Sequence, residues 1–170
     1  MEHKHPELLS PAGNFEKMRA AIRYGADAVY LAGTRLGMRS SAGNFSEEAL
    51  REAVAYAHAR GVRVYLTVNV MPRGDEYPAL REYFREIADF GIDAMIVADL
   101  GVLALVREVL PTMEIHISTQ ANVVSAETCL AYAALGAKRI VLARELTLDE
   151  IRAIRAAIPD DLELEVFIHG

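Results

Sequence analysis

The chain has 170 residues, of which 52% are hydrophobic and 25% charged, a composition typical of one globular domain that excludes a disordered chain, a collagen or a disulfide scaffold. The net charge of −6 argues against a general electrostatic affinity for nucleic acid, although it leaves room for a local basic patch. Cys129 is the single cysteine, so the chain forms neither an intrachain disulfide nor a multi-cysteine metal site.

Nothing in the sequence indicates secretion or membrane insertion. The first seven residues are polar and lack the apolar core of a secretion signal. The longest apolar run, over residues 94–106, is interrupted by Asp99 and falls short of the roughly 20 residues that a membrane helix needs. We therefore expect a cytoplasmic protein with no membrane partner.

Short aliphatic runs alternate with helical patterns along the whole chain. In chain order we predict strand 7–10, helix 15–24, strand 28–32, helix 47–60, strand 62–70, helix 77–90, strand 94–98, helix 102–110, strand 114–119, helix 126–135, strand 139–143, helix 148–158 and strand 162–168. Short connections between such elements predict a parallel sheet with right-handed crossovers.

Residues that start and stop helices support these boundaries. A glycine follows four of the predicted helices, where a left-handed residue is favoured, at Gly25, Gly61, Gly91 and Gly136. Asn14 and Ser46 are candidate N-caps, and Thr147 with Glu150 matches a capping box. These capping residues therefore predict the same helix ends as the hydrophobic periodicity does.

Two closures of the sheet are possible, a doubly wound open sheet or a TIM-like (β/α)8 barrel. The first strand-to-helix turn lacks the glycines of a dinucleotide-binding loop, and three strands alternate aliphatic with polar residues, as a barrel strand does. The side chains predicted to point inward are Tyr65, Thr67, Asn69, His116, Ser118, Gln120, Glu165, Phe167 and His169.

The predicted strand count falls short of a closed barrel. About eight strands close such a barrel, and the seventh predicted strand ends with the chain. We therefore expect residues 1–170 to form a single (β/α) barrel domain truncated to about seven strands and six helices and incomplete at its C-terminus. With its edge strands unpaired, such a domain is expected to be marginally stable or to self-associate.

Polar residues gather where the predicted strands end, which is the catalytic end of this architecture. They are Ser10, Asn69, Asp99, Ser118, Gln120, Arg144, Glu145 and His169, and the loop after the second strand adds Arg35, Arg39 and Asn44. One interpretation is a partly cationic pocket for a polar or anionic substrate. The alternative is that these residues only cap the barrel and bond to loop backbone.

Other site chemistries have weaker support. His116 and His169, with Asp99 or Glu145, lack the spacing of a metal motif, so we predict no metal site. Ser10 and Ser118 lack a nucleophile elbow. Cys129 lies among apolar neighbours and is interpreted as a small packed hydrophobe.

A string of motifs resembles peptidase family U32, the collagenase-like peptidase family. The motifs are ELLSPAGN (7–14), YGADAVYL (24–31), Arg39 with AGNFS (42–46), TVN (67–69), HISTQAN (116–122), LAREL (142–146) and EVFIHG (165–170). They occur in the right order over nearly the whole chain.

The resemblance implies one of two activities. The family is named for proteolysis of unassigned mechanism, whereas several similar proteins hydroxylate transfer RNA, ribosomal RNA or a ubiquinone precursor with prephenate as co-substrate. Those proteins often carry an iron–sulfur cluster on cysteines that follow the EVFIHG segment, and Cys129 matches no cluster position. We therefore expect no cofactor in this chain and an iron–sulfur cluster only in a longer parent.

The main hypothesis is the N-terminal barrel of an RNA or small-aromatic hydroxylation enzyme. We assign catalytic roles to His116, His169, Ser118 and Gln120, and binding of a small anionic co-substrate to Arg39, Asn44, Asn69, Asp99, Arg144 and Glu145. The expected partners are RNA, through the parent protein, and a second copy or a homologous subunit. The alternatives are a collagenase-like protease and a non-catalytic barrel subunit that pairs with an active homologue.

Overall fold

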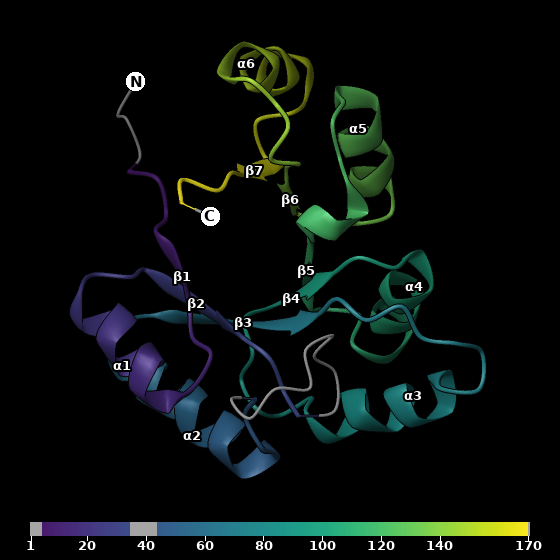
Figure 1. Ribbon diagram of the computed structural model, residues 1–170. Coiled ribbons are helices and arrows are strands. Elements are labelled where there is room, and N and C mark those ends of the chain that lie inside the picture. Colours follow the sequence, from purple (N-terminus) through teal and green to yellow (C-terminus); the bar gives the residue numbers. More distant parts are fainter. Residues whose placement is uncertain (1–4, 35–43, 170) are drawn as a thin grey trace.

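The computed structural model describes residues 5–34 and 44–169, in which seven parallel strands pair in sequence order (Figure 1). The strands are β1 (Leu9–Pro11), β2 (Ala28–Leu31), β3 (Arg63–Val68), β4 (Ala94–Val97), β5 (Glu114–Ile117), β6 (Arg139–Val141) and β7 (Glu163–Glu165). The α-helices are α1 (Phe15–Arg23), α2 (Glu47–His58), α3 (Tyr77–Glu86), α4 (Leu100–Val109), α5 (Ala126–Ala134) and α6 (Leu148–Ala157), and a short 3₁₀ helix spans Thr119–Ala121.

The strand order decides between the two closures. In a doubly wound sheet the order reverses at a switch point, and helices then cover both faces. Here each strand pairs with the next one in sequence, and the sheet curls with the helices on its outer, convex side (Figure 1). The fold is therefore part of a TIM-like barrel, as the sequence predicts, with β1 and β7 as its edge strands. None of the helices in residues 5–34 and 44–169 is long and apolar enough to cross a membrane.

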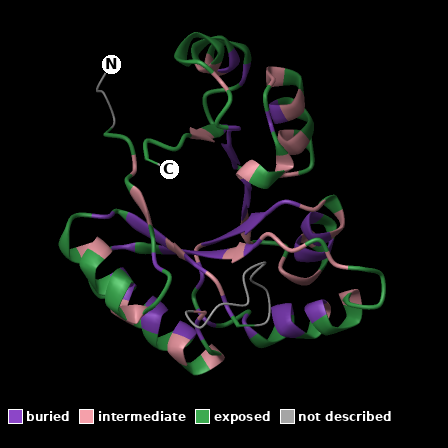
Figure 2. Cartoon of the chain, in the orientation of Figure 1, coloured by how far each residue is buried: buried purple, intermediate pink, exposed green. Residues whose placement is uncertain are grey.

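The two faces of the sheet have different cores because strand side chains alternate with a period of two. The outer face of β3 places Val64, Leu66 and Val68 against the helices, and all three are buried (Figure 2). The inner face carries a smaller apolar cluster of Ala28, Tyr65, Ala94 and Ile96. Polar side chains occupy much of the remaining inner face, and they form the sites described below.

The predicted caps are confirmed. Asn14 accepts a hydrogen bond from the backbone N–H of Lys17, Ser46 accepts one from Ala49, and Thr147 and Glu150 form the capping box. Gly25 and Gly136, which follow α1 and α5, have φ values of 94° and 92°, in the left-handed region that favours glycine.

Strands β2 to β7 each end one to three residues earlier than predicted, and two of them show why. β7 stops at Glu165 rather than residue 168 because β6, its neighbour, ends at Val141, the residue in register with Glu165. The last backbone hydrogen bond there joins the N–H of Leu142 to the carbonyl of Glu165 at 3.0 Å. β5 stops at Ile117 because the Ser118 hydroxyl accepts the N–H of Gln120 and begins the 3₁₀ helix. Phe167, His169, Ser118 and Gln120 therefore follow the strands rather than lying within them.

Candidate functional site

The predicted mouth residues follow the carboxyl ends of consecutive strands. Asn69 follows β3, Asp99 follows β4, Ser118 and Gln120 follow β5, Arg144 and Glu145 follow β6, and His169 follows β7. Parallel strands bring these positions to one end of the barrel. Asn44 is half-buried beside Phe45, whose backbone pairs with Gly33 beyond β2. The predicted cations Arg35 and Arg39 lie outside the described residues.

Asp99 and Ser118 have structural partners at this end. The Asp99 carboxylate accepts the N–H of Val102 and the hydroxyl of Tyr77, both at 2.9 Å, and thereby caps α4. Ser118 is buried, and its hydroxyl accepts the N–H of Gln120 at 3.3 Å. These are the contacts that the structural interpretation of the mouth residues predicts.

The rest of the lip is more open to solvent. Gln120, Arg144, Glu145 and His169 are exposed, and Asn69 is half-buried. The Arg144 guanidinium lies 4.5 Å from the centroid of the Phe167 ring, within the range of a cation–π contact. This contact joins the loop after β6 to the segment after β7 and leaves the guanidinium at the surface of the lip.

Inside the barrel, His116 and Glu114 form a hydrogen-bonded pair. They are two residues apart on β5 and therefore share its inner face. His116 is fully buried, and its Nε2 lies 2.8 Å from a carboxylate oxygen of Glu114. The imidazole packs edge-on against Tyr65, with 4.7 Å between the ring centroids. The sequence predicts the inward orientation of both rings, and the structure confirms it.

The electrostatics of the pair fix the position of its proton. Burial lowers the pKa of His116, and the hydrogen bond from His116 holds the pKa of Glu114 below its usual range. At neutral pH the imidazole is therefore neutral and Glu114 is an ionised carboxylate, which only accepts hydrogen bonds. The proton must then be on Nε2, so Nδ1 presents a lone pair. Nδ1 is buried and finds no hydrogen-bond partner among the described residues. A water or substrate hydroxyl placed there would meet a proton acceptor.

A second interior cluster surrounds Arg139, the first residue of β6. Its Nη1 donates to Glu7 at 2.7 Å, and its Nε donates to Glu163 at 2.8 Å. Glu165 lies 3.5 Å from Nη1, and burial raises the pKa of its carboxyl. Arg139 is only 5% exposed, so its charge depends on these carboxylates rather than on water.

Glu7 extends this cluster to β3. Its carboxylate accepts the hydroxyl of Tyr65 at 2.8 Å and forms an ion pair with Arg63. The sequence analysis missed this cluster, although a signal is present. Four strands begin with a charged residue that faces inward, namely Arg63, Glu114, Arg139 and Glu163. First positions of parallel strands meet at the amino end of the barrel, so this cluster lies toward the end opposite the lip.

The buried imidazole leads to a prediction about pH. Because the folded-state pKa of His116 is lowered, its contribution to stability is present above its unfolded pKa of about 6.5 and is lost as the pH falls from that value toward the lower folded-state pKa. We expect the urea midpoint to fall as the pH is lowered below about 6.5, and the His116→Gln variant to lose that dependence. His169→Gln, a change at an exposed histidine, is the control and should keep it. An unchanged slope in His116→Gln would contradict the tautomer argument. The raised pKa of Glu165 acts in the opposite sense, and this contribution is common to all three proteins.

The available ligand atoms do not fit an iron–sulfur cluster. Cys129 is the only cysteine of the chain, and it is buried on α5, where burial raises the pKa of its thiol. Within residues 5–34 and 44–169, no group of three His, Cys, Asp or Glu side chains is arranged to hold a metal ion. Four-cysteine ligation therefore needs cysteines that this chain does not have.

An open (β/α) barrel with polar residues at its carboxyl lip and a buried histidine inside defines a class of fold, and comparison with known proteins gives the family. The chain belongs to peptidase family U32, whose profile matches residues 13–170. Among solved structures, the fold is similar to that of the U32 peptidase Mk0906, with a TM-score of 0.76. The two sequences are 21% identical, and the match covers 98% of this chain and 71% of that chain. At this identity the likeness shows the fold alone.

Curated relatives share more of the sequence. tRNA hydroxylation protein P of Helicobacter pylori strain J99 is 44% identical over 165 residues, which is 96% of this chain and 39% of the relative. The 23S rRNA 5-hydroxycytidine C2501 synthase of Escherichia coli K12 is 41% identical over 164 residues, which is 96% of this chain and 24% of the relative. The chain thus spans well under half the length of these relatives.

Proposed function

We propose that this chain is the barrel part of a protein that hydroxylates RNA. The proposal is carried by the likeness to the tRNA and rRNA hydroxylation proteins, which extends over 96% of the chain. The barrel contributes an interior proton acceptor, Nδ1 of His116, and a polar lip above it. In the proposed reaction His116 takes a proton from a water or hydroxyl at Nδ1, and Glu114 holds the imidazole in the required tautomer.

The proposed co-substrate is a small anion of the prephenate type. A guanidinium suits a carboxylate because its planar fork donates two parallel hydrogen bonds. Arg144 lies at the lip with its guanidinium exposed over Phe167, and Arg39 is the second proposed cation. His169, Gln120, Asn69 and Glu145 are proposed to line the same lip. Asn44, Asp99 and Ser118 are proposed to position its loops.

The remaining proposals concern cofactor, partners and location. Any iron–sulfur cluster of the whole protein would be held by residues outside this chain, since Cys129 alone cannot ligate it. RNA is the proposed macromolecular substrate, a second copy or homologous subunit is a proposed partner, and the cytoplasm is the proposed location. Proteolysis is the weaker candidate because the Ser118 hydroxyl is committed to capping the 3₁₀ helix rather than activated by a base.

The test is RNA hydroxylation in cells that lack their own RNA hydroxylation protein. Expression of the whole protein should restore a nucleoside heavier by one oxygen atom in digested RNA, detected by mass spectrometry. Arg144→Lys keeps the charge but loses the fork, so we expect at least a roughly tenfold decrease with the fold intact. Arg152→Lys, on the exposed face of α6, is the matched control and should keep activity. Full activity in Arg144→Lys would remove Arg144 from the co-substrate site. A wild type that restores no hydroxylation, while the protein folds, would refute the proposal.

A further inference from the structure

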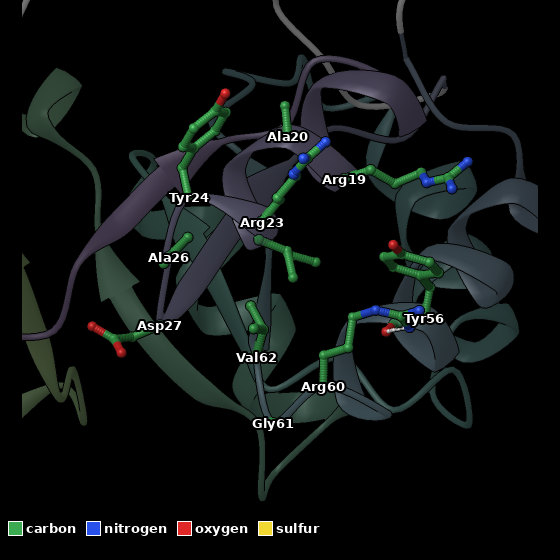
Figure 3. Close-up of a pocket in the computed structure, with 12 residues that line it drawn as sticks. Arg19, Ala20, Arg23, Tyr24, Ala26, Asp27, Tyr56, Arg60, Gly61 and Val62 are labelled. Atoms are coloured by element: carbon green, nitrogen blue, oxygen red, sulfur yellow. Dashed lines mark hydrogen bonds between the residues drawn. The ribbon is translucent and has the colours of Figure 1, made fainter.

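A groove on the outer wall of the barrel carries an unusual concentration of arginines. It lies between the C-terminal ends of α1 and α2 and has a volume of about 960 Å³ (Figure 3). Its lining includes three arginines, Arg19, Arg23 and Arg60, and one acidic residue, Asp27. The Asp27 carboxylate accepts a hydrogen bond of 2.8 Å from the backbone N–H of Leu8. Because three arginines face one carboxylate, the groove is nevertheless locally cationic in a chain whose net charge is −6.

Aromatic side chains lie among these arginines. Arg60 stacks on the Tyr56 ring with its Cζ 3.6 Å from the ring centroid, and Arg19 lies over the same ring at 5.7 Å (Figure 3). Stacking holds the Arg60 guanidinium against the ring, and among the described residues one hydrogen bond, to the Tyr56 carbonyl at 2.9 Å, uses one of its five N–H donors. Tyr24 is 84% exposed, which is a large aromatic surface left in contact with water.

The backbone of the groove is also accessible. Gly25 and Gly61 line it, and a Cβ built at either glycine would meet no heavy atom within 4 Å. The buried side chains of Ala26 and Val62 form an apolar floor. A chain of phosphates can therefore approach the groove closely while the faces of its bases meet apolar and aromatic surface.

We propose that this groove binds the phosphate backbone of RNA and that Tyr24 stacks on a base. Guanidinium forks match phosphate oxygens, and arginines interleaved with exposed aromatics are the recurring composition of single-stranded nucleic-acid sites. The groove lies at the amino end of the barrel, away from the lip, so it holds the RNA at a distance from the reacting nucleotide. The choice of RNA rests on the proposed function, whereas the cationic groove is independent of it.

A purely structural role for the arginines, in which they only stabilise helix ends, makes a different prediction. Arg23 lies in the last turn of α1, where a cation offsets the negative end of the helix dipole. If stabilising the helix ends were their only role, removing Arg19 and Arg23 would lower the melting temperature and leave RNA affinity unchanged.

The experiment measures binding of fluorescently labelled transfer RNA and of single-stranded RNA by anisotropy over a range of salt concentrations. The Arg19→Gln/Arg23→Gln double variant is expected to lose affinity about tenfold at low salt and to reduce the slope of log affinity against log salt by about 1.4, or 0.7 for each lost phosphate contact. The matched control is Arg85→Gln/Arg152→Gln, which removes the same charge from exposed positions on α3 and α6. It should change affinity less than about twofold.

Tyr24→Leu tests the stacking separately. It should weaken binding of single-stranded RNA about fivefold and leave the salt slope unchanged, because stacking releases no counterions. Equal losses in the groove and control double variants would indicate general electrostatics and overturn the proposal. Polyglutamate of matched charge that competes as well as RNA would assign the groove to acidic protein segments and overturn it too.

The outcomes separate this inference from the proposed function. If the wild-type chain binds no RNA, or the groove variants bind as the wild type does, the groove is not an RNA site even where hydroxylation is restored in cells. If the groove binds RNA as expected but hydroxylation is not restored, the proposed function fails and the groove inference stands.

Discussion

Replacing His116 with glutamine is expected to reduce RNA hydroxylation by about a hundredfold while the barrel stays folded. Glutamine can still donate a hydrogen bond to Glu114, but its amide cannot take up a proton at any pH near neutrality. The measurement is the amount of oxygen-bearing nucleoside in RNA from cells that make the variant, with circular dichroism of the purified protein as the folding check. Hydroxylation at the wild-type level would remove His116 from the reaction.

Glu114→Gln separates chemistry from positioning. The proposed proton acceptor is Nδ1 of His116, and Glu114 only orients that imidazole. Loss of the carboxylate should therefore act through His116 and lower RNA hydroxylation by about tenfold. Without the carboxylate the protonated imidazole loses its stabilising partner, so the pKa of His116 should fall further. The acid limb of the activity profile should then move to lower pH. A purely structural role would lower activity at every pH without moving this limb.

Replacing Arg139 with leucine is expected to lower the free energy of unfolding by about 3 kcal/mol, because Glu165 loses its guanidinium in the barrel interior and Glu7 keeps only its ion pair with Arg63. For a chain of this size the melting temperature should fall by about 10 °C. The matched control is Arg152→Leu, whose ion pair with Asp149 has side chains 72% and 91% exposed. Its effect should stay below about 0.5 kcal/mol.

The deficit of Arg139→Leu should shrink as the pH is lowered toward about 4. Carboxylates without a cation in a poorly solvated interior have raised pKa values, so protonation favours the folded variant more than its unfolded chain. Denaturant unfolding at several pH values measures this directly. Equal destabilisation by Arg139→Leu and Arg152→Leu would show that the interior cluster contributes no more than a surface pair.

The sequence predicted the fold well because the signals that determine it are local. Alternation along 114–117 is enough to place His116 on the inner face, and Tyr65 follows from the same rule on β3. Glycines such as Gly25 and caps such as Asn14 act within a few residues of themselves, so most helix ends were also predictable, whereas α3 ends at Glu86, four residues before its predicted end. The ends of β2 to β7 were predicted one to three residues too late, because the end of a strand depends on where its neighbour stops.

The interior cluster was not predictable because its contacts join distant residues. Arg139 forms hydrogen bonds with Glu163, 24 residues away in sequence, and with Glu7, 132 residues away. Neither contact can be predicted from the sequence unless the strand register is known. At the lip the difficulty is different. Asp99 and Ser118 were predicted in the right place, but whether a carboxylate or hydroxyl turns to the pocket or to a helix N–H depends on loop geometry. The site roles of the other lip residues stay predictions.

Glu7 links the start of the chain to strands that are synthesised much later. It lies just before β1, yet its carboxylate is held by Tyr65 and Arg139, which are 58 and 132 residues further along. At translation rates of about 5–20 residues per second, the guanidinium partner leaves the ribosome about 7–26 seconds after Glu7. The contacts of the segment just before the first strand are thus completed only late in synthesis. Until Arg139 emerges, the Glu7 carboxylate has only Tyr65 and Arg63 of β3 as partners, so a pause in translation before residue 139 would prolong the time for which this carboxylate lacks the more buried of its two guanidinium partners.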